Sequence, residues 1–352
     1  MKLVIISKEV FGNTDFMEFS KIAIKKGYAV DYICQGIKPC VTVPAGVNII
    51  DVTSGFTKIN FFYSIYIFTL LLRKYDKSSF FHLRHYTFCS LLSLLRLFDY
   101  DICCDVRSGC VSKSNMYNKM KNILTRIELK CFKHISILSE GIAKKIFKLH
   151  KYQILPLGAN SVELSKTKNR FNDPIKFVYV GTLFNREIPK LIKSFESACV
   201  RYRLNYTLDI FGSGDSKSVS EVESVSSECR SVVYRGYLER ALLADALTEF
   251  DIGISFIPII ENFDLQPPTK NFEYLFSGLP VIATSTTANC EVVEDGQNGW
   301  LVDDGEDALV KFFGTCAFNF IPAEKCVESV SERTWENIFE NYYMKLVNSV
   351  KC

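Results

Sequence analysis

The sequence predicts an α/β protein with two doubly wound halves, each a mainly parallel sheet covered by helices. Apolar runs of strand length alternate along the chain with amphipathic segments of helix length, which is typical of βαβ units. The alternation stops at a polar segment, 163–174, that ends in proline, and then begins again. The 352 residues, 48% of them hydrophobic, are enough to give each half its own core.

The first half is expected to alternate strands with helices from its start. The strands are placed at 2–7, 28–35, 79–85, 100–108 and 135–140. The helices are placed at 16–27, 87–98 and 140–149, with Gly27 closing the first of them. The longest apolar stretch, 59–72, has about 14 residues, too few to span a bilayer, so it predicts a buried or half-buried helix.

The second half repeats the pattern more cleanly. Its strands are placed at 176–181, 206–212, 231–236, 251–258 and 279–284, and its helices at 189–202, 240–250 and 268–278. We therefore expect domains at 1–158 and 159–334, with 335–352 as a closing helix that crosses back to the first domain. Ligands of such sheets bind beyond the carboxyl ends of the strands, so the site is expected there.

The composition indicates a cytoplasmic protein with reduced thiols. The 13 cysteines form no CxxC pair, and the four histidines are not spaced as metal ligands. The first ten residues have neither the apolar core nor the cleavage site of a secretory signal. We expect no disulfide framework and no zinc site.

Charge is distributed unevenly. The net charge of +3 is too small to indicate a nucleic-acid-binding protein, so no nucleic-acid partner is expected. The stretch 113–151 nevertheless holds ten Lys and Arg against two Glu, a local charge of +8. A basic, partly amphipathic stretch of this kind either contacts anionic lipid at the inner face of a membrane or is a solvated helix face, and the sequence leaves both interpretations open.

The segment 266–280, QPPTKNFEYLFSGLP, carries the most chemical information. Pro268 suits the start of a helix, and Gly278 followed by proline suits its end. The helix therefore begins next to Lys270, where free N–H groups and a formal charge together favour a diphosphate. Glu273 lies on the same face, where its carboxylate could accept hydrogen bonds from ribose hydroxyls. The alternative is a surface Lys–Glu pair on an ordinary amphipathic helix.

This segment, extended to PPTKNFEYLFSGLPVIAT, resembles the donor-site segment of glycosyltransferase family 4, whose form is P-x-K-x-x-E-Y-x-x-x-G-x-P-V. Other pieces resemble that family in the same order along the chain. They are ILPLGAN, FVYVGTLFNREIPKLIKSFESA, LDIFGSGD, CEVVEDGQNGWLV and RTWENIFENYYMKLV. The resemblance covers about residues 150–345 and implies the GT-B fold, two Rossmann-like domains facing a cleft.

The resemblance also implies which residues bind the donor, a nucleoside-diphosphate sugar. The implied donor-binding residues are Gly181, Thr182, Gly212, Tyr237, Leu238, Thr269, Lys270, Asn271 and Glu273. The family's cations after V-G-x-L are missing, and the nearest cation, Arg186, is our candidate for a second phosphate ligand. Much of the family has an acidic residue eight positions before the ribose-binding Glu; here that position is Leu265, so the sugar cannot be inferred.

Candidates on the acceptor side lie in the first half, where the resemblance is weakest. His82, Arg84 and His85 end one expected strand and Arg107 ends another, which are positions that face a cleft. A histidine there could bond a sugar hydroxyl or relay a proton near neutral pH, and of the two we favour His85 as a catalytic residue with Lys270 and Arg186. Alternatively, both are hydrogen-bonded loop histidines.

A shortened version of the family's first glycine-bearing loop adds two more acceptor-side candidates, Gly12 and Asn13.

The expected reaction is retaining sugar transfer that needs no metal or other cofactor. The partners would be a nucleoside-diphosphate sugar, with uridine favoured over guanosine, and a glycan or polyprenyl-linked acceptor in surface-polysaccharide assembly. Two alternatives stay open: another GT-B enzyme such as a nucleotide-sugar 2-epimerase, and a non-catalytic nucleotide-sugar binder. The location expected is the cytoplasm, with peripheral contact to the membrane through 113–151.

Overall fold

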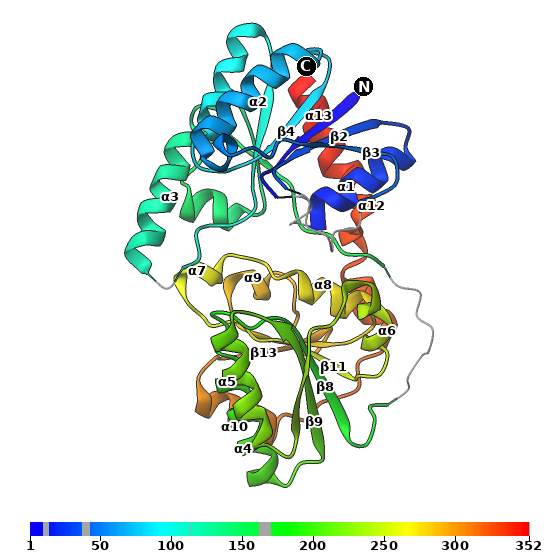
Figure 1. The fold of residues 1–352 in the computed structure, drawn as a ribbon. Coiled ribbons are helices and arrows are strands. Elements are labelled where there is room, and N and C mark those ends of the chain that lie inside the picture. The colour runs from blue at the N-terminus through cyan, green and yellow to red at the C-terminus, as the bar shows by residue number, and fades with distance from the viewer. Residues whose placement is uncertain (10–13, 37–42, 113, 162–169, 352) are drawn as a thin grey trace. The chain divides into compact units, whose positions relative to one another are not determined.

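The computed structural model describes residues 1–9, 14–36, 43–112, 114–161 and 170–351. The chain forms two compact units, one of residues 1–158 together with 335–352, and the other of residues 159–334 (Figure 1). The first unit contains both ends of the chain, because the last helical segment packs with the N-terminal half. Each unit is an α/β sheet structure and is described separately below.

The first unit contains a sheet of parallel strands in the order β3-β2-β1-β4-β5-β6-β7. The strands are β1 (Lys2–Ile6), β2 (Ala29–Cys34), β3 (Val47–Asp51), β4 (Phe80–Arg84), β5 (Ile102–Val106), β6 (His134–Ile137) and β7 (Gln153–Ile154). The register places Leu3 beside Val30 on one side and beside Phe80 on the other. The central strands are buried on both faces, as parallel strands between helices must be.

Helical segments connect these strands and cover the sheet. They are α1 (Thr14–Lys25), η1 (Phe56–Lys58), α2 (Asn60–Lys74), η2 (Cys89–Phe98), α3 (Asn115–Leu129) and η3 (Ile142–Ile146). The half-buried helix expected at 59–72 is α2, with Ile67 and Leu71 buried and Phe61 and Ile65 exposed. The segment expected as an ordinary helix at 87–98 is a 3-10 helix instead.

The C-terminal segment completes the hydrophobic core of the first unit. It consists of α12 (Trp335–Ile338), η6 (Phe339–Tyr343) and α13 (Met344–Lys351). Trp335 and Tyr343 are buried, and both contact Phe19 of α1, with ring centroids 5.7 and 4.6 Å away. Removing this segment would therefore expose the apolar face of α1.

The second unit contains a parallel sheet in the order β10-β9-β8-β11-β12-β13. The strands are β8 (Ile175–Thr182), β9 (Tyr206–Ser213), β10 (Val232–Gly236), β11 (Ile252–Ser255), β12 (Val281–Thr284) and β13 (Gly299–Val302). The helical segments are α4 (Ile188–Tyr202), α5 (Ser216–Ser227), η4 (Arg240–Leu242), α6 (Leu243–Leu247), α7 (Glu261–Asp264), α8 (Thr269–Phe276), α9 (Thr287–Cys290), α10 (Glu306–Thr315), α11 (Ala323–Ser329) and η5 (Ser331–Arg333). Helices α4, α5 and α10 lie together along one side of the sheet (Figure 1).

Both sheets reverse their direction of winding at their first strand. In the first unit β1 lies between β2 and β4, and in the second unit β8 lies between β9 and β11. At such a switch point the loops leave the sheet in opposite directions, which opens a crevice at the carboxyl ends of the strands. The fold therefore directs attention to the ends of β1 and β4, and of β8 and β11.

Two further properties concern the chain as a whole. Within the described ranges, no helix is both long enough and apolar enough to cross a bilayer. The cysteines of the same ranges are all free thiols.

Candidate functional site

Helix α8 begins beside the switch point of the second sheet. Tyr274, buried on this helix, accepts a 2.7 Å hydrogen bond from the backbone N–H of Val180 at the end of β8. The same ring lies against Gly253 of β11, where an added Cβ would come within 2.4 Å of it. Helix α8 is therefore fixed against both strands. Its N-cap residue, Pro268, makes no side-chain cap hydrogen bond, so the first turn of α8 presents N–H groups of the kind that bind anions.

Lys270, in the first turn of α8, is half-buried, and its ammonium group forms no ion pair with any residue that the structure describes. Its Nζ atom has no hydrogen-bond partner among the described residues and lies 4.0 Å from the centre of the Tyr179 ring. Burial lowers the pKa of Lys270 well below its usual range, the nearby Arg186 lowers it further, and the carboxylate of Glu273 offsets only part of this effect. The desolvated ammonium group would gain free energy from an anion at this position.

Arg186, in the loop between β8 and α4, is a second cation of the same kind. Its guanidinium lies 3.9 Å from the centre of the Phe263 ring, and its Nη1 atom is buried with no hydrogen-bond partner in the described ranges. Burial lowers the pKa of Arg186. Two cations on aromatic faces beside a helix N-terminus form an arrangement that suits a diphosphate.

Two glycines shape the backbone beside these cations. Gly181 has φ +154°, and a Cβ there would lie 3.2 Å from Nζ of Lys270. A Cβ on Gly212, at the end of β9, would lie 2.3 Å from the carbonyl oxygen of Gly181. The Thr182 carbonyl accepts a 2.8 Å hydrogen bond from the hydroxyl of Tyr179. Side chains at 181 and 212 would therefore close the space that Lys270 faces.

Glu273 lies one turn further along α8, beside a small pocket. Its Oε1 atom accepts a 3.3 Å hydrogen bond from Arg240, and burial raises the pKa of its carboxyl group. The pocket has a volume of about 70 Å³ and is also lined by Ala244 and Ser277. A ribose that bonds Glu273 would share the carboxylate with Arg240 or displace it.

The other residues implied for the donor site differ in accessibility. Tyr237, on the loop after β10, is 69% exposed, and Leu238 and Thr269 are partly exposed, so all three can meet a ligand. Asn271 is fully buried, and its amide donates a 2.9 Å hydrogen bond to Asn289 of α9. Asn271 thus joins α8 to α9 and does not face a ligand, contrary to the role implied for it.

Leu265, the departure from the family pattern, is a buried apolar residue with 7% of its surface exposed. Its acidic neighbour Asp264 does not substitute for the missing carboxylate, because both of its oxygens accept hydrogen bonds from Thr287 at the start of α9.

Two of the residues expected on the acceptor side are structural. His82 is fully buried, and burial lowers its pKa to about 4, so it is neutral at pH 7. Arg107 is 6% exposed; it pairs with Asp15 of α1 and donates a hydrogen bond to the carbonyl of Leu155. We therefore correct both predictions: His82 and Arg107 hold α1 and the strand ends together and do not face an acceptor.

His85 and Arg84 are more accessible, at the carboxyl end of β4. The Nε2 atom of His85 lies 3.0 Å from a carboxylate oxygen of Glu128 on α3. Burial acts to lower the pKa of His85, but hydrogen bonds with Cys89 and Glu128 outweigh it and raise the pKa to about 9. His85 is then protonated at neutral pH, which argues against a proton relay and leaves a charged donor. Arg84, partly exposed, lies 3.4 Å from Asp105.

The side chains of His85, Cys89 and Glu128 also form the one group in the described part of the chain that could hold a metal ion. Their potential ligand atoms all lie within 4.8 Å of one another. The hydrogen bonds among the three side chains account for their positions. The remaining two acceptor-side candidates, Gly12 and Asn13, lie outside the described residues.

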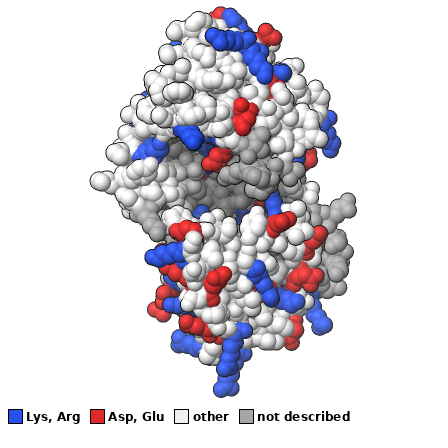
Figure 2. Space-filling model, in the orientation of Figure 1, with Lys and Arg blue, Asp and Glu red and all other residues white. Residues whose placement is uncertain are grey.

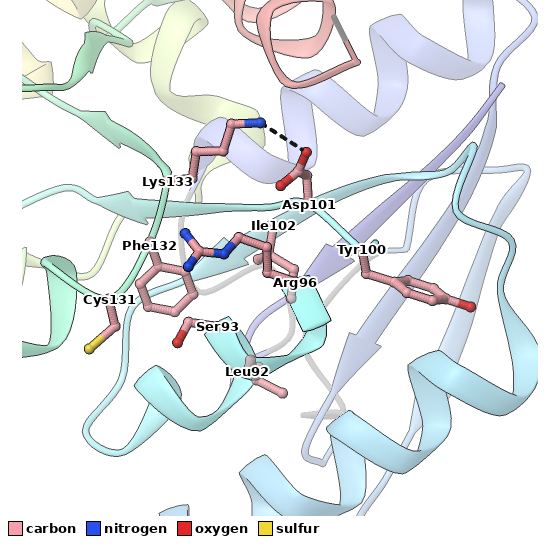
Figure 3. A pocket seen from close by; sticks show the side chains of 9 residues that line it. All are labelled: Leu92, Ser93, Arg96, Tyr100, Asp101, Ile102, Cys131, Phe132 and Lys133. Atoms are coloured by element: carbon pink, nitrogen blue, oxygen red, sulfur yellow. Dashed lines mark hydrogen bonds and ion pairs between the residues drawn. The ribbon is translucent and has the colours of Figure 1, made fainter. Parts of the chain in front are cut away.

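Two other pockets lie at the amino-terminal ends of strands. One pocket, of about 10 Å³, has room for a single water molecule. Figure 3 shows it beside the start of β5, bordered by the 3.3 Å pair of Lys133 and Asp101. Another, of about 320 Å³, is lined by Lys176 and Thr207 at the starts of β8 and β9. Ligands of doubly wound sheets bind at the opposite, carboxyl ends.

Three site residues were not identified from the sequence: Tyr179 under Lys270, Phe263 under Arg186, and Arg240 on Glu273. The strand alternation in KFVYVG places Tyr179 on the same face as Gly181, and this is the one signal that pointed toward it.

Comparisons with known proteins bear on the fold and on the class of enzyme. Residues 174–314 match the family model described as glycosyl transferases group 1, and no curated protein sequence matches the chain. A sucrose-phosphate synthase from Thermosynechococcus elongatus is 15% identical, with 99% of this chain and 100% of that one covered and a TM-score of 0.74. The lipopolysaccharide outer core galactosyltransferase WaaB, in its apo form, is 14% identical over 99% of both chains, with a TM-score of 0.72.

A third solved structure was determined with ligands. The pneumococcal O-GlcNAc transferase GtfA, in complex with UDP and GlcNAc, is 17% identical over 82% of this chain and 60% of that one, with a TM-score of 0.60. The structural likenesses establish a GT-B fold, and together with the domain match they identify the chain as a glycosyltransferase.

Proposed function

We propose that this glycosyltransferase is a retaining, metal-independent enzyme that takes its sugar from a nucleoside diphosphate bound in the second unit. The observation that carries the proposal is the pair of half-buried cations Lys270 and Arg186. Nζ of Lys270 and Nη1 of Arg186 are buried without a hydrogen-bond partner, and neither side chain forms an ion pair in the described ranges. Charges buried in this way are costly unless a ligand completes them. A diphosphate with two negative charges would complete both.

The diphosphate, ribose and base of the donor would each bind at a different place along or beside α8. The diphosphate would lie against Lys270, Arg186 and the first-turn N–H groups, with Gly181 and Gly212 allowing its close approach. The ribose would bond Glu273, and the base would lie near Tyr237 and Leu238. A uridine nucleotide is favoured, and the UDP bound to the pneumococcal neighbour supports that choice.

In the reaction the bond between the sugar C1 and the diphosphate oxygen breaks, and a bond forms between C1 and the acceptor oxygen on the same face. Negative charge grows on the leaving diphosphate, where Lys270, Arg186 and the helix N–H groups stabilise it. The acceptor proton passes to a phosphate oxygen of the leaving group. These residues stabilise the leaving charge without a metal ion or a covalent intermediate.

The acceptor would be a glycan or a polyprenyl-linked sugar in surface-polysaccharide assembly in the cytoplasm. The likeness to the lipopolysaccharide galactosyltransferase supports this class of acceptor. On the first unit, Arg84 and the protonated His85 are the charged donors that remain accessible at the carboxyl end of β4.

The test measures release of UDP from UDP-glucose, UDP-galactose and UDP-N-acetylglucosamine, with and without glycolipid extract or short glycans as acceptor. Release that requires the acceptor, with the product retaining the configuration of the donor, supports the proposal. Conversion of a donor in the absence of acceptor indicates an epimerase and overturns it. Donor binding with no turnover across the panel indicates a non-catalytic binder and also overturns it.

A further inference from the structure

The first unit exposes a row of large apolar side chains on α3. Met116, Met120, Ile123 and Ile127 recur every three or four residues, so they lie along one side of the helix. They are 81%, 64%, 57% and 56% exposed. A row of this length is uncommon on a protein surface that faces only water.

The neighbouring helical segments continue this surface. Phe61, exposed on α2, contacts the ring of Phe88, which is 50% exposed and precedes η2, with centroids 6.2 Å apart. Lys121 of α3 donates a hydrogen bond to Thr87. The exposed apolar side chains of α2, residues 88–98 and α3 therefore belong to adjoining elements, and we call them together the apolar face.

Phe88 is held in place at a conformational cost. Its φ of +73° lies in the left-handed region, which a bulky side chain rarely adopts. Glu128 of α3 accepts hydrogen bonds from the Phe88 N–H and from the Ser90 hydroxyl, which fixes the turn. The result is an exposed aromatic ring on a rigid support, a combination that usually accompanies a binding role.

The charge on the apolar face has one sign; the exposed Asp99, directly after residue 98, is paired with Lys77. Its helical segments carry the basic residues Arg73, Lys74, Arg96, Lys119, Lys121 and Arg126. Their one acidic residue is Glu128, which is 5% exposed and bonded to His85. In Figure 2 the surface over α3 is uncharged with scattered Lys and Arg, whereas charges of both signs are mixed over the second unit.

We propose that the apolar face docks onto an anionic lipid bilayer, with the side chains of α3 among the acyl chains and its lysines at the headgroups. A bilayer surface of this kind attracts both the apolar side chains and the cations. A second copy packed on the same face would instead bring like charges together. Because α3 has 15 residues and polar flanks, it would lie in the plane of the bilayer.

This inference does not rest on the proposed function. It concerns residues of the first unit, whereas the nucleotide is placed on the second. The two can therefore fail separately, and a thermal shift with UDP, measured on every variant below, reports on the nucleotide site alone.

The experiment measures flotation of the full chain with vesicles of phosphatidylcholine alone or mixed with phosphatidylglycerol. The wild type should bind the mixed vesicles, and binding should weaken as salt is raised. Met120→Ser with Ile123→Ser should weaken binding at least about tenfold, because buried apolar area is lost. Lys119→Glu should weaken it at least about fivefold.

Matched controls lie on the second unit. Val200 on α4 is 68% exposed and the side chain of Lys217 on α5 is 76% exposed, so Val200→Ser and Lys217→Glu make the same chemical changes elsewhere. Both should bind vesicles as the wild type does. Binding to neither vesicle, or equal binding by the double variant and the wild type, overturns the proposal. A dimer that Ile123→Ser dissociates, without any vesicle binding, also overturns it and identifies a second copy as the occupant.

Discussion

Both units have charged or titratable residues near the carboxyl ends of their strands, but the two units pair these residues differently. In the first unit, Arg107 is buried against Asp15 and a backbone carbonyl, and His82 is neutral inside the core. In the second unit, the half-buried Lys270 and Arg186 lie against aromatic rings, and their buried Nζ and Nη1 atoms have no hydrogen-bond partner in the described ranges. A buried charged group whose hydrogen-bond and ion-pair partners belong to the protein is structural. A buried charged group without such partners indicates a ligand that binds there.

The largest expected effect comes from removing the central cation. Lys270→Met should reduce turnover by about 10²–10³-fold, because a group that stabilises the leaving charge is lost. Its melting temperature without ligand should stay the same or rise, since burial of an unpaired ammonium group is relieved. Steady-state kinetics and calorimetry measure the two quantities. Lys325→Met, an exposed control, should change neither. A clear loss of ligand-free stability in Lys270→Met would show that Lys270 is structural.

The second prediction applies the same reasoning to a largely buried pair within the protein, His85 and Glu128. Glu128→Gln removes the charge that faces His85 and should destabilise the first unit by about 3 kcal/mol at pH 6. The pKa of His85 in the folded protein is raised to about 9. The charge of His85 therefore contributes fully to the free energy of unfolding below about pH 6.5, and this contribution is lost as pH rises through 9. The difference between variant and wild type should therefore shrink over that range.

Urea unfolding of a Trp300→Phe background, in which Trp335 reports on the first unit, measures this difference. The exposed Glu336→Gln is the control and should leave the unfolding free energy unchanged. A difference for Glu128→Gln that does not depend on pH would mean that His85 carries no charge in the pair.

The third prediction concerns the close approach of Gly212, at the end of β9, to Gly181 at the end of β8. Gly212→Ala places a Cβ 2.3 Å from the Gly181 carbonyl oxygen and should destabilise the second unit by about 2 kcal/mol. Trp300, in a Trp335→Phe background, reports on that unit. Gly55→Ala in the first unit, where the space is open and φ is negative, should change the stability of that unit by about 0.5 kcal/mol or less. Trp335, in a Trp300→Phe background, reports on this control. Equal effects of the two substitutions would contradict the close packing of β8 and β9.

The smallest expected effect is the change in UDP affinity when Arg240 is substituted. This residue bonds the carboxylate of Glu273 from an exposed position, and such pairs contribute little. Arg240→Ala should therefore tighten UDP binding by about fivefold at most, because the carboxylate becomes free for the ribose. Isothermal titration measures the affinity, with Arg201→Ala as an exposed control on α4. Weaker binding would mean that Arg240 itself contacts the nucleotide.

The sequence predicted the second unit better than the first because its signals are local. Lys270, Glu273 and Gly278 lie within a single helix, so spacing alone predicted α8 and its orientation. Most of the strands were also predicted, because buried parallel strands are continuous apolar runs. Strand β3 and helix α5 were missed: β3 is half exposed, and α5 is rich in serine, so neither shows a clear apolar pattern.

The roles of individual polar residues could not be predicted in the same way. Arg107 and Asp15 are 92 positions apart, and no local pattern indicates that one neutralises the other. His82 lies in an apolar run just as a cleft residue would, but Phe16 of α1 and Tyr343 of η6 pack against its ring and bury it. The conformation of η2 depends on left-handed residues at both ends, Phe88 and Asp99, which composition does not suggest.

The most direct test of the account compares thermal unfolding of the wild type and Glu273→Ala with saturating UDP, GDP, ADP and CMP. A nucleoside diphosphate that binds only the folded protein should raise the melting temperature of the second unit by about 5 °C or more. We predict such a shift with one base, UDP first, and its loss in the variant. No shift with any nucleotide, or the same shift in Glu273→Ala, would contradict the claim that the unpaired cations of the second unit bind a nucleoside diphosphate.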